Sequence, residues 1–510
     1  MKIKIPFILF TLFIMLTACG LENNPEEDSN EDSSSDSDNS LIVAQQSDTT
    51  TLDPQKQGDM PSMNVLINMF DTLLTSDEDN NVAPALATDW EATDDKTWEF
   101  QLRDDVTFHN GEEFNAETVK FSIERLLDPE TQSPIVELSN VEEVNIVDDY
   151  TVEIVTETPD PILPNKLTLF GGVMVPKEYI EEEGEEHFAE NPVGTGPFQY
   201  DSWQKDSEVV MDAYEDYWQG APKVDELTFR VIPDDSNLAS ALTADEIDIA
   251  ANISPDVASQ LSDTENVNID TEQGIRTFFI NLDADDEDSP LHEKKVRQAL
   301  NYAVDVDVMI DSVLGGNASK VPTIVPQENF GFDDSITPYE YDPEKAKELL
   351  AEAGYEDGFD IEFNANNLDS NIVQVIAAQL EDVGVNAEIE LMDSETFISN
   401  ISSGDVAPMY FNGNTGWTLD AMSNFQSFIR SDRRYNRWDN EEADKLVDIE
   451  EQTIDSDARQ EAFTELQEII KEEAPFIFLY QKDNLYGVRD DVNWDANSIG
   501  VLRMYNAAKQ

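Results

Sequence analysis

The sequence predicts a mixed α/β fold that is continuous from residue 41, and three observations predict it. Strand-like alternation of apolar and polar residues and helical apolar stripes follow one another along the chain. Several helices carry capping signals at their ends, and no second low-complexity segment interrupts the chain after residue 40. Because domains usually contain about 100–200 residues, we expect two or three of them.

The first 18 residues are typical of a secretory signal. Lys2 and Lys4 precede an apolar stretch, and small residues precede Cys19, the single cysteine among 510 residues. The apolar stretch is shorter than the about 20 residues that a membrane-spanning helix needs. We therefore expect residues 1–18 to be removed and the mature protein of 492 residues to be exported.

The run Leu16-Thr17-Ala18-Cys19 resembles the lipobox of bacterial lipoproteins. The resemblance implies that Cys19 carries lipid, palmitate included, and becomes the new N-terminus. A diacyl thioether supplies two chains, as stable anchoring requires; an ordinary signal with a stray thiol is the alternative. Residues 19–40 are acidic and polar, which predicts a disordered acidic tether between the membrane and the folded part.

The charge of the chain is strongly one-sided. Thirty basic residues against 110 acidic ones give a net charge of −80, which excludes nucleic acids and anionic lipid surfaces as partners by repulsion. Since salt screens such self-repulsion, we expect a halophilic protein, with simple solubility as the alternative. Carboxylates are so frequent that their spacing predicts no acid/base pair. With no cysteine beyond Cys19, disulfides and thiolate metal sites are also excluded.

The first half of the folded part begins with a short apolar strand over 41–44. A half-buried strand is predicted over 98–102, where apolar and polar side chains alternate. Asn115 is the expected cap of a helix that ends before Pro129. Two alternating runs joined by a pair of aspartates then predict a hairpin over 144–155.

The second half alternates helices and strands more regularly. An aspartate followed by proline starts a helix over 343–353, and a glycine ends it. A second helix over 372–383 leads directly into a strand over 385–391. A late apolar stripe predicts a helix over 462–470, and a proline separates it from a strand over 476–480.

Two segments resemble binding motifs superficially. The loop 191–198 contains Gly194 and Gly196, but neither the P-loop nor the dinucleotide-binding spacing is met, so we expect a structural crossover. The acidic run 283–288 would attract Ca²⁺, yet Asp288 occupies the position where an EF-hand loop requires glycine. We interpret this run as a solvated loop and predict neither a metal nor a cofactor.

An enzyme is the competing class. The histidines His109, His187 and His292 lie in a turn, an acidic run and a helix start, where surface or structural roles are expected. The sequence contains no Gly-x-Ser-x-Gly elbow and no His-Glu-x-x-His helix. A glycosidase needs only two carboxylates, so this alternative stays open to an assay on chromogenic glycosides.

A set of short segments is spread over nearly the whole mature chain. The segments are 84–90, 98–111, 191–198, 296–305, 341–346, 349–355 and 473–475. Each is weak alone. In this order and behind a lipobox, they resemble the extracytoplasmic solute-binding proteins of peptide-type ABC importers, family 5.

The resemblance implies a periplasmic-binding-protein-like clamp of two lobes (type II, cluster C) with an inserted domain. Domain I would comprise residues 41–74, 193–275 and 482–510, domain II residues 75–192, and domain III residues 276–481. Closure of the lobes would trap a solute, because the ligand favours the closed state. The protein would be an extracytoplasmic monomer, periplasmic where an outer membrane exists, and would do no chemistry. It would deliver its solute to a membrane permease driven by a separate ATPase.

The resemblance also implies a site at Gly416, Trp417, Thr418 and Asp420. In peptide-binding members, the aspartate of a Trp-x-x-Asp segment pairs with the ammonium group of the ligand, a charge-assisted contact. Trp417 would supply a flat wall or a cation–π face. The alternatives are a solvated loop acid for Asp420 and core packing for Trp417.

This chain departs from the dipeptide binders at two places. The arginine that clamps the ligand's carboxylate early in a helix is absent from 369–374, and the usual Asp-Pro-Asp run is replaced at 421–423. Longer peptides, glutathione-like compounds, opines, oligosaccharides and nickel complexes therefore stay open as ligands.

Overall fold

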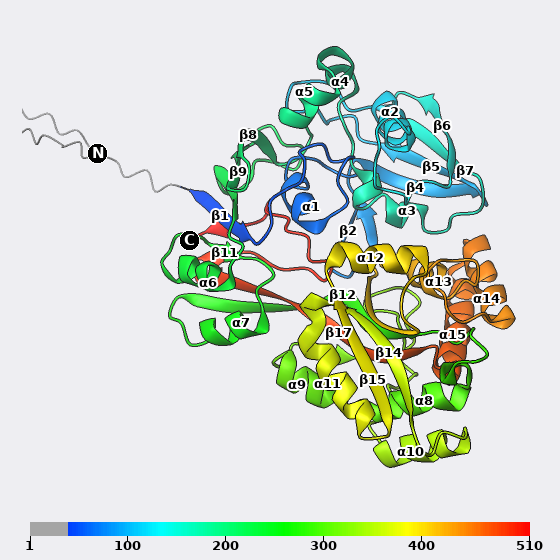
Figure 1. Ribbon diagram of the computed structural model, residues 1–510. Helices are drawn as coiled ribbons and strands as arrows, with labels where there is room; N and C mark the ends of the chain where they lie inside the picture. The colour runs from blue at the N-terminus through cyan, green and yellow to red at the C-terminus, as the bar shows by residue number, and fades with distance from the viewer. Residues whose placement is uncertain (1–38) are drawn as a thin grey trace, which may run out of the picture. The chain divides into compact units, whose positions relative to one another are not determined.

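The computed structural model describes residues 39–510 (Figure 1). The predicted signal, Cys19 and the tether up to residue 38 lie outside the described residues. Strand β1 (Ser40–Gln45) starts one residue earlier than expected, and the side chain of Asn39 donates a hydrogen bond to the Lys223 carbonyl. Ser40 therefore belongs to the sheet and not to the tether.

A mixed sheet of eleven strands dominates residues 39–510. Its order is β15-β14-β16-β12-β17-β11-β1-β10-β9-β8, with β13 paired to β17. The strands are β1, β8 (Phe198–Gln204), β9 (Glu208–Ala213), β10 (Glu226–Val231), β11 (Ile249–Ala250), β12 (Val267–Leu282), β13 (Ala318–Lys320), β14 (Phe359–Asn366), β15 (Val385–Met392), β16 (Met409–Thr415) and β17 (Phe476–Arg489).

Strands β12 and β17 are the longest, with 16 and 14 residues, and they pair antiparallel from Val267↔Arg489 to Asn281↔Phe476. One end of this pair lies beside β11, and the other end lies beside β16. The sequence predicted only 476–480 of β17 and none of β12. Both strands cross the predicted boundaries between domains I and III, which lie after residues 275 and 481. The division into these domains stays a prediction.

A separate four-stranded antiparallel sheet has the order β4-β5-β7-β6 and lies apart from the large sheet in Figure 1. Its strands are β4 (Ala87–Asp94), β5 (Thr97–Leu102), β6 (Val141–Asp148) and β7 (Thr151–Thr156). Helix α2 (Ala116–Leu127) packs on it, and Asn115 with Thr118 forms a capping box at its start. The predicted strand, capped helix and hairpin are thus confirmed. Two short pairs complete the strands: β2 (Leu74–Ser76) with β3 (Val82–Pro84), and β18 (Val492–Asn493) with β19 (Ala508–Lys509).

The predicted helices of the second half are present as α10 (Pro343–Glu352), α11 (Ser370–Glu381) and α15 (Ser456–Glu473). Helix α15 begins six residues before the expected start, because its first turns are polar and Asp455 caps them. The other helices are α1 (Met60–Leu66), α3 (Leu163–Lys166), η1 (Phe170–Gly172), α4 (Lys177–Glu183), α5 (Glu185–Glu190), α6 (Asp235–Thr243), α7 (Pro255–Leu261), η2 (Pro290–His292), α8 (Lys294–Ala303), α9 (Val306–Val313), η3 (Asn367–Asp369), α12 (Ser394–Ser403), α13 (Met422–Phe428) and α14 (Glu441–Gln452).

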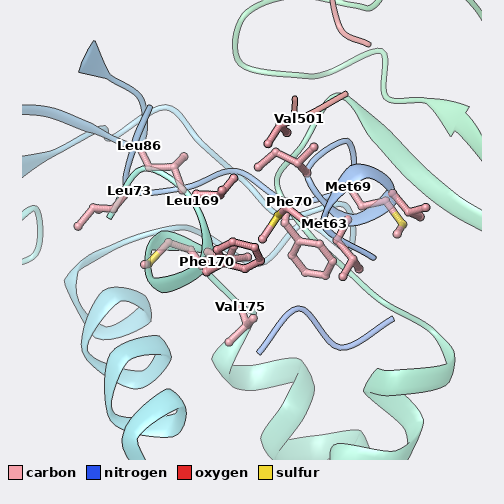
Figure 2. Packing of buried hydrophobic residues seen from close by; sticks show 14 of the residues in the cluster. Met63, Met69, Phe70, Leu73, Leu86, Leu169, Phe170, Val175 and Val501 are labelled. Carbon is pink, nitrogen blue, oxygen red and sulfur yellow. The ribbon is translucent and has the colours of Figure 1, made fainter. Parts of the chain in front are cut away.

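The largest apolar cluster joins α1, the four-stranded sheet and the C-terminal segment. Figure 2 shows part of it, with Met63, Phe70 and Phe170 among the buried side chains that pack together. Val501, from the end of the chain, belongs to the same cluster. Burial of a large apolar side chain contributes about 1.5–3 kcal/mol, so this cluster anchors the four-stranded sheet to α1 and to the C-terminal segment.

The loop 191–198 packs against the segment 68–70, which follows α1, and against the turn that holds His109. Gly194 and Gly196 lie against the backbone of Met69, where a Cβ on Gly196 would lie 2.6 Å from the Met69 carbonyl carbon. His109 Nε2 lies 2.9 Å from the Gly196 carbonyl, and its Nδ1 accepts from the Gly194 amide. Burial lowers the pKa of His109 to about 4. This histidine holds the loop, as expected for a structural residue.

Candidate functional site

A cavity of about 840 Å³ separates two walls of the protein. The residues of one wall come from 136–140 and 158–166, on either side of strands β6 and β7. Those of the other come from 417–435, which includes α13, and from the end of α14. Because the walls come from different parts of the chain, a solute in this cleft would contact both.

A second cavity of about 270 Å³ adjoins the cleft, since Ser427 and Tyr435 line both. Its walls include the aromatic side chains Phe278, Phe411 and Phe428. Polar groups also reach it, among them asparagine side chains from β14 and β16. Apolar walls with a few convergent polar groups are typical of small-molecule sites.

Three carboxylates that line the larger cleft have a buried oxygen without a hydrogen-bond partner. They are Glu137 Oε2, Asp160 Oδ1 and Glu451 Oε1. Burial raises the pKa of Glu137 and of Glu451. Buried polar groups normally have partners, so these oxygens are acceptors available to a donor within the cleft.

The cations of the cleft already have partners. Lys166 Nζ lies 2.6 Å from Asp160 Oδ2, and Arg430 Nη1 lies 2.6 Å from Glu451 Oε2. Burial alone would lower the pKa of Arg430, but Glu451 and two further acids raise it above its ordinary value. The site therefore holds both signs of charge at short range.

Comparisons with known proteins agree with this architecture. Residues 81–436 match the model of bacterial extracellular solute-binding proteins, family 5. The chain belongs to this family. A glutathione-binding protein of Salmonella typhimurium is 29% identical over 453 residues, which cover 86% of this chain and 88% of that protein. A dipeptide-binding protein of Escherichia coli is 29% identical over 448 residues, covering 81% and 83%.

A solved structure shows the same fold. The ABC transporter-associated periplasmic binding protein DppA of Helicobacter pylori, in complex with a peptide, has a TM-score of 0.77 at 25% identity and covers 92% of this chain and 98% of that one. The predicted family and the fold class of a periplasmic binding protein are thus confirmed. This solute-binding protein captures a solute outside the cytoplasm for an ABC importer; the family consists of binding proteins and not of enzymes.

The cleft of this solute-binding protein contains two of the four residues predicted as a site. Trp417 and Thr418 line it. The Trp417 ring packs edge-on against Phe170 with ring centroids 5.5 Å apart, and the Asn165 side chain donates to the Thr418 carbonyl at 2.8 Å. The Asn165–Thr418 hydrogen bond joins the two segments that form the walls.

The other two predicted residues lie behind the cleft surface. Gly416 packs against Pro326 and Asn329, where a Cβ would meet both side chains. Asp420 is 3% exposed, and its Oδ1 accepts from Arg459 Nη2 at 2.6 Å and from the Met422 amide at 3.0 Å. A ligand ammonium at Asp420 would share the carboxylate with Arg459.

Sequence reasoning missed Glu137, Asp160 and Glu451, because acids are too frequent in this chain to single any of them out. A signal did exist on the opposite wall. Four arginines fall within residues 430–437 of a chain with 30 basic residues in total. Such a concentration of arginines indicates that positive charge has a role in this segment. Three of them, Arg430, Arg433 and Arg434, line the cleft.

Metal-ligating side chains do not cluster within residues 39–510. This part of the chain brings no three of them together in a way that would hold an ion. Likewise, none of the helices described here has the length and apolar character to cross a membrane.

Proposed function

We propose that this solute-binding protein captures small peptides with a free amino group, glutathione-like tripeptides included, as a lipid-anchored monomer. The single observation that carries the proposal is the set of unpartnered carboxylate oxygens of Glu137, Asp160 and Glu451 in one cleft. An ammonium group donates three hydrogen bonds, and such charge-assisted bonds are about twice as strong as neutral ones. The names of the relatives, which bind glutathione and dipeptides, support the same class of solute.

Two positions compete for the ammonium group. Asp420 is the partner that the family resemblance implies, with Trp417, Thr418 and Gly416 shaping its surroundings. Glu137 and Glu451 are closer to the cleft and have free oxygens, whereas the Asp420 carboxylate already accepts two hydrogen bonds. We propose that the glutamates hold the ammonium group and that Asp420 fixes the loop that carries Trp417.

The test is a thermal-shift screen of the soluble protein from residue 39 onward, against trialanine, pentaalanine, glutathione, an opine and cellotriose. A ligand at a hundred times its Kd stabilises by about 2.7 kcal/mol, so binding raises the Tm visibly. Free-amine peptides are expected to raise the Tm, and N-acetyl-trialanine is not. A shift with the opine or cellotriose alone would refute the peptide proposal.

The same screen tests halophilic adaptation, since it is run in dilute buffer and in molar NaCl. We expect the Tm of the free protein to rise with salt, because salt screens the repulsion among the acidic residues. A Tm that does not rise would contradict halophilic adaptation.

Variants separate the two ammonium positions. Glu137→Gln and Glu451→Gln are each expected to weaken trialanine binding about tenfold, as the loss of a charge-assisted hydrogen bond predicts. Glu142→Gln, an exposed acid on β6, is the matched control and should bind normally. If both glutamate variants bind like the native protein while Asp420→Asn does not bind, the ammonium group belongs at Asp420.

The lipid anchor is proposed from the lipobox at Cys19, which lies outside the described residues. Radiolabelled palmitate is expected to label the full-length protein in cells and to leave Cys19→Ala unlabelled. Equal labelling of both proteins would remove the anchor from the proposal.

A further inference from the structure

Arg276 on β12 and Lys482 on β17 are directly opposite each other in the antiparallel ladder. Opposite residues in such a ladder point to the same face, with Cβ atoms about 4.5–5.5 Å apart, and like charges in this arrangement are destabilising. A sheet that keeps two cations side by side therefore carries a local electrostatic cost. This cost is offset when an anion lies between them.

Among the described residues, no protein anion forms an ion pair with either cation, although Asp369 is close enough to act electrostatically on both. Within residues 39–510, neither the Arg276 guanidinium nor the Lys482 ammonium group has a hydrogen bond or an ion pair with a protein atom. Other arginines of the described chain, such as Arg459 and Arg430, contact carboxylates directly. In a chain with 110 acidic residues, two neighbouring cations without an ion pair are available to a ligand.

The local structure holds Arg276 at the smaller cavity. Its guanidinium lies over the ring of Phe278, 4.9 Å from the centroid, and Phe278 stacks on Tyr480. Gly413 on β16 leaves room for this arrangement, because a Cβ there would lie 3.2 Å from Arg276 Nε and 3.0 Å from the Phe278 ring. Arg276 as a whole residue is exposed, and it lines the cavity of about 270 Å³.

Asp369 provides the third charge. It lies at the start of α11 and lines the same cavity, and among the described residues its carboxylate accepts no hydrogen bond. Burial raises the pKa of Asp369, while the nearby Arg276 and Lys482 act in the opposite direction. With Asp369 ionised, the three groups have one positive charge in excess, which matches one carboxylate better than a phosphate dianion.

We propose that Arg276 and Lys482 bind a carboxylate of the captured solute, and that Asp369 limits the site to a single negative charge. Arg276 would contact both carboxylate oxygens through its planar fork, and Lys482 would contribute a point charge. This inference rests on the proposed function, since it assigns the acidic end of the same peptide. Arg276 and Lys482 would also replace the carboxylate-binding arginine that dipeptide binders carry early in this helix and that is absent from residues 369–374 here.

The test compares C-terminal acids with C-terminal amides by calorimetry. The ligands are trialanine and glutathione as free acids, and trialanine amide, whose C-terminus carries no charge. Each ligand is measured on the native protein, on Arg276→Gln and on Lys482→Gln. Free acids are expected to lose about tenfold or more in affinity in both variants, and trialanine amide is expected to bind all three proteins alike. Lys205→Gln, an exposed lysine between β8 and β9, is the control and should bind like the native protein. Glutathione carries two carboxylates and trialanine one, so a loss for glutathione alone assigns the site to the α-carboxylate of its γ-glutamyl residue.

Equal affinity of trialanine and its amide for the native protein, together with an unchanged affinity of glutathione for Arg276→Gln, would overturn the inference. A second measurement keeps this failure distinct from failure of the peptide proposal. In the ¹³C spectrum of the reductively methylated protein, sodium acetate is expected to shift the Lys482 signal relative to equal sodium chloride. The shift should be absent in Arg276→Gln. If no peptide binds but acetate shifts Lys482, the peptide proposal fails and the carboxylate site stands; if acetate does not shift Lys482, the carboxylate site fails.

Discussion

Replacement of Arg459 by methionine is expected to lower the free energy of unfolding by about 4 kcal/mol at neutral pH. Arg459 is 5% exposed, donates to Asp420 at 2.6 Å, and donates through Nε to the Glu450 carbonyl at 3.2 Å. Methionine retains much of the apolar volume but leaves the Asp420 carboxylate buried without a cation. Urea denaturation at constant high salt measures the loss.

A double variant separates this cause from simple packing loss. Asp420→Asn removes the carboxylate that Arg459→Met leaves buried without its cation. The double variant Arg459→Met with Asp420→Asn is therefore expected to be more stable than the single one. A double variant no more stable than Arg459→Met alone would contradict the ionic explanation.

The Gly194→Ala variant is expected to lose about 3 kcal/mol of folding free energy, as overpacking against a fixed backbone does. A Cβ at this position overlaps the carbonyl oxygen of Met69 and approaches the Phe70 ring. The backbone of Met69 cannot give way easily, because its carbonyl accepts from the Gly196 amide and Phe70 is fully buried. Thermal and urea unfolding measure the effect.

Gly111→Ala is the matched control in the neighbouring turn. Gly111 has φ +87°, and no atom lies within 4 Å of the place that an added methyl group would take, so only the backbone conformation is affected. A loss of about 1–2 kcal/mol is expected there. If Gly194→Ala were no more destabilising than Gly111→Ala, the close packing of loop 191–198 would not contribute to stability as described.

Much of the fold follows from local signals in the sequence. Asn115 and Asp342 cap the helices predicted from them, and strict alternation around Phe100 gives a strand of the four-stranded sheet. Strand β12 escaped prediction because its first half is polar, and that half is stabilised by pairing with β17, which is about 200 residues away in the chain. Long-range pairing of this kind leaves no local pattern.

The site was less predictable for a related reason. Trp417 was found through a motif, whereas Glu137 and Glu451 differ from other glutamates only in their burial and in the absence of partners. Burial is a property of the assembled walls. In a chain with 110 acids, a functional carboxylate becomes visible only after the partners of all the others are known.

The continuous pairing of β12 and β17 has a mechanical consequence. Parts of the protein at the two ends of this ribbon cannot move apart by sliding, because every step would break ladder hydrogen bonds. They can move only if the ribbon flexes. Register shifts interrupt its ladder between Gln273 and Arg276 and between Phe278 and Phe279, so we expect bending near these positions. Arg276 is the first paired residue after the first shift. A solute held at Arg276 would therefore bind where we expect the ribbon to bend.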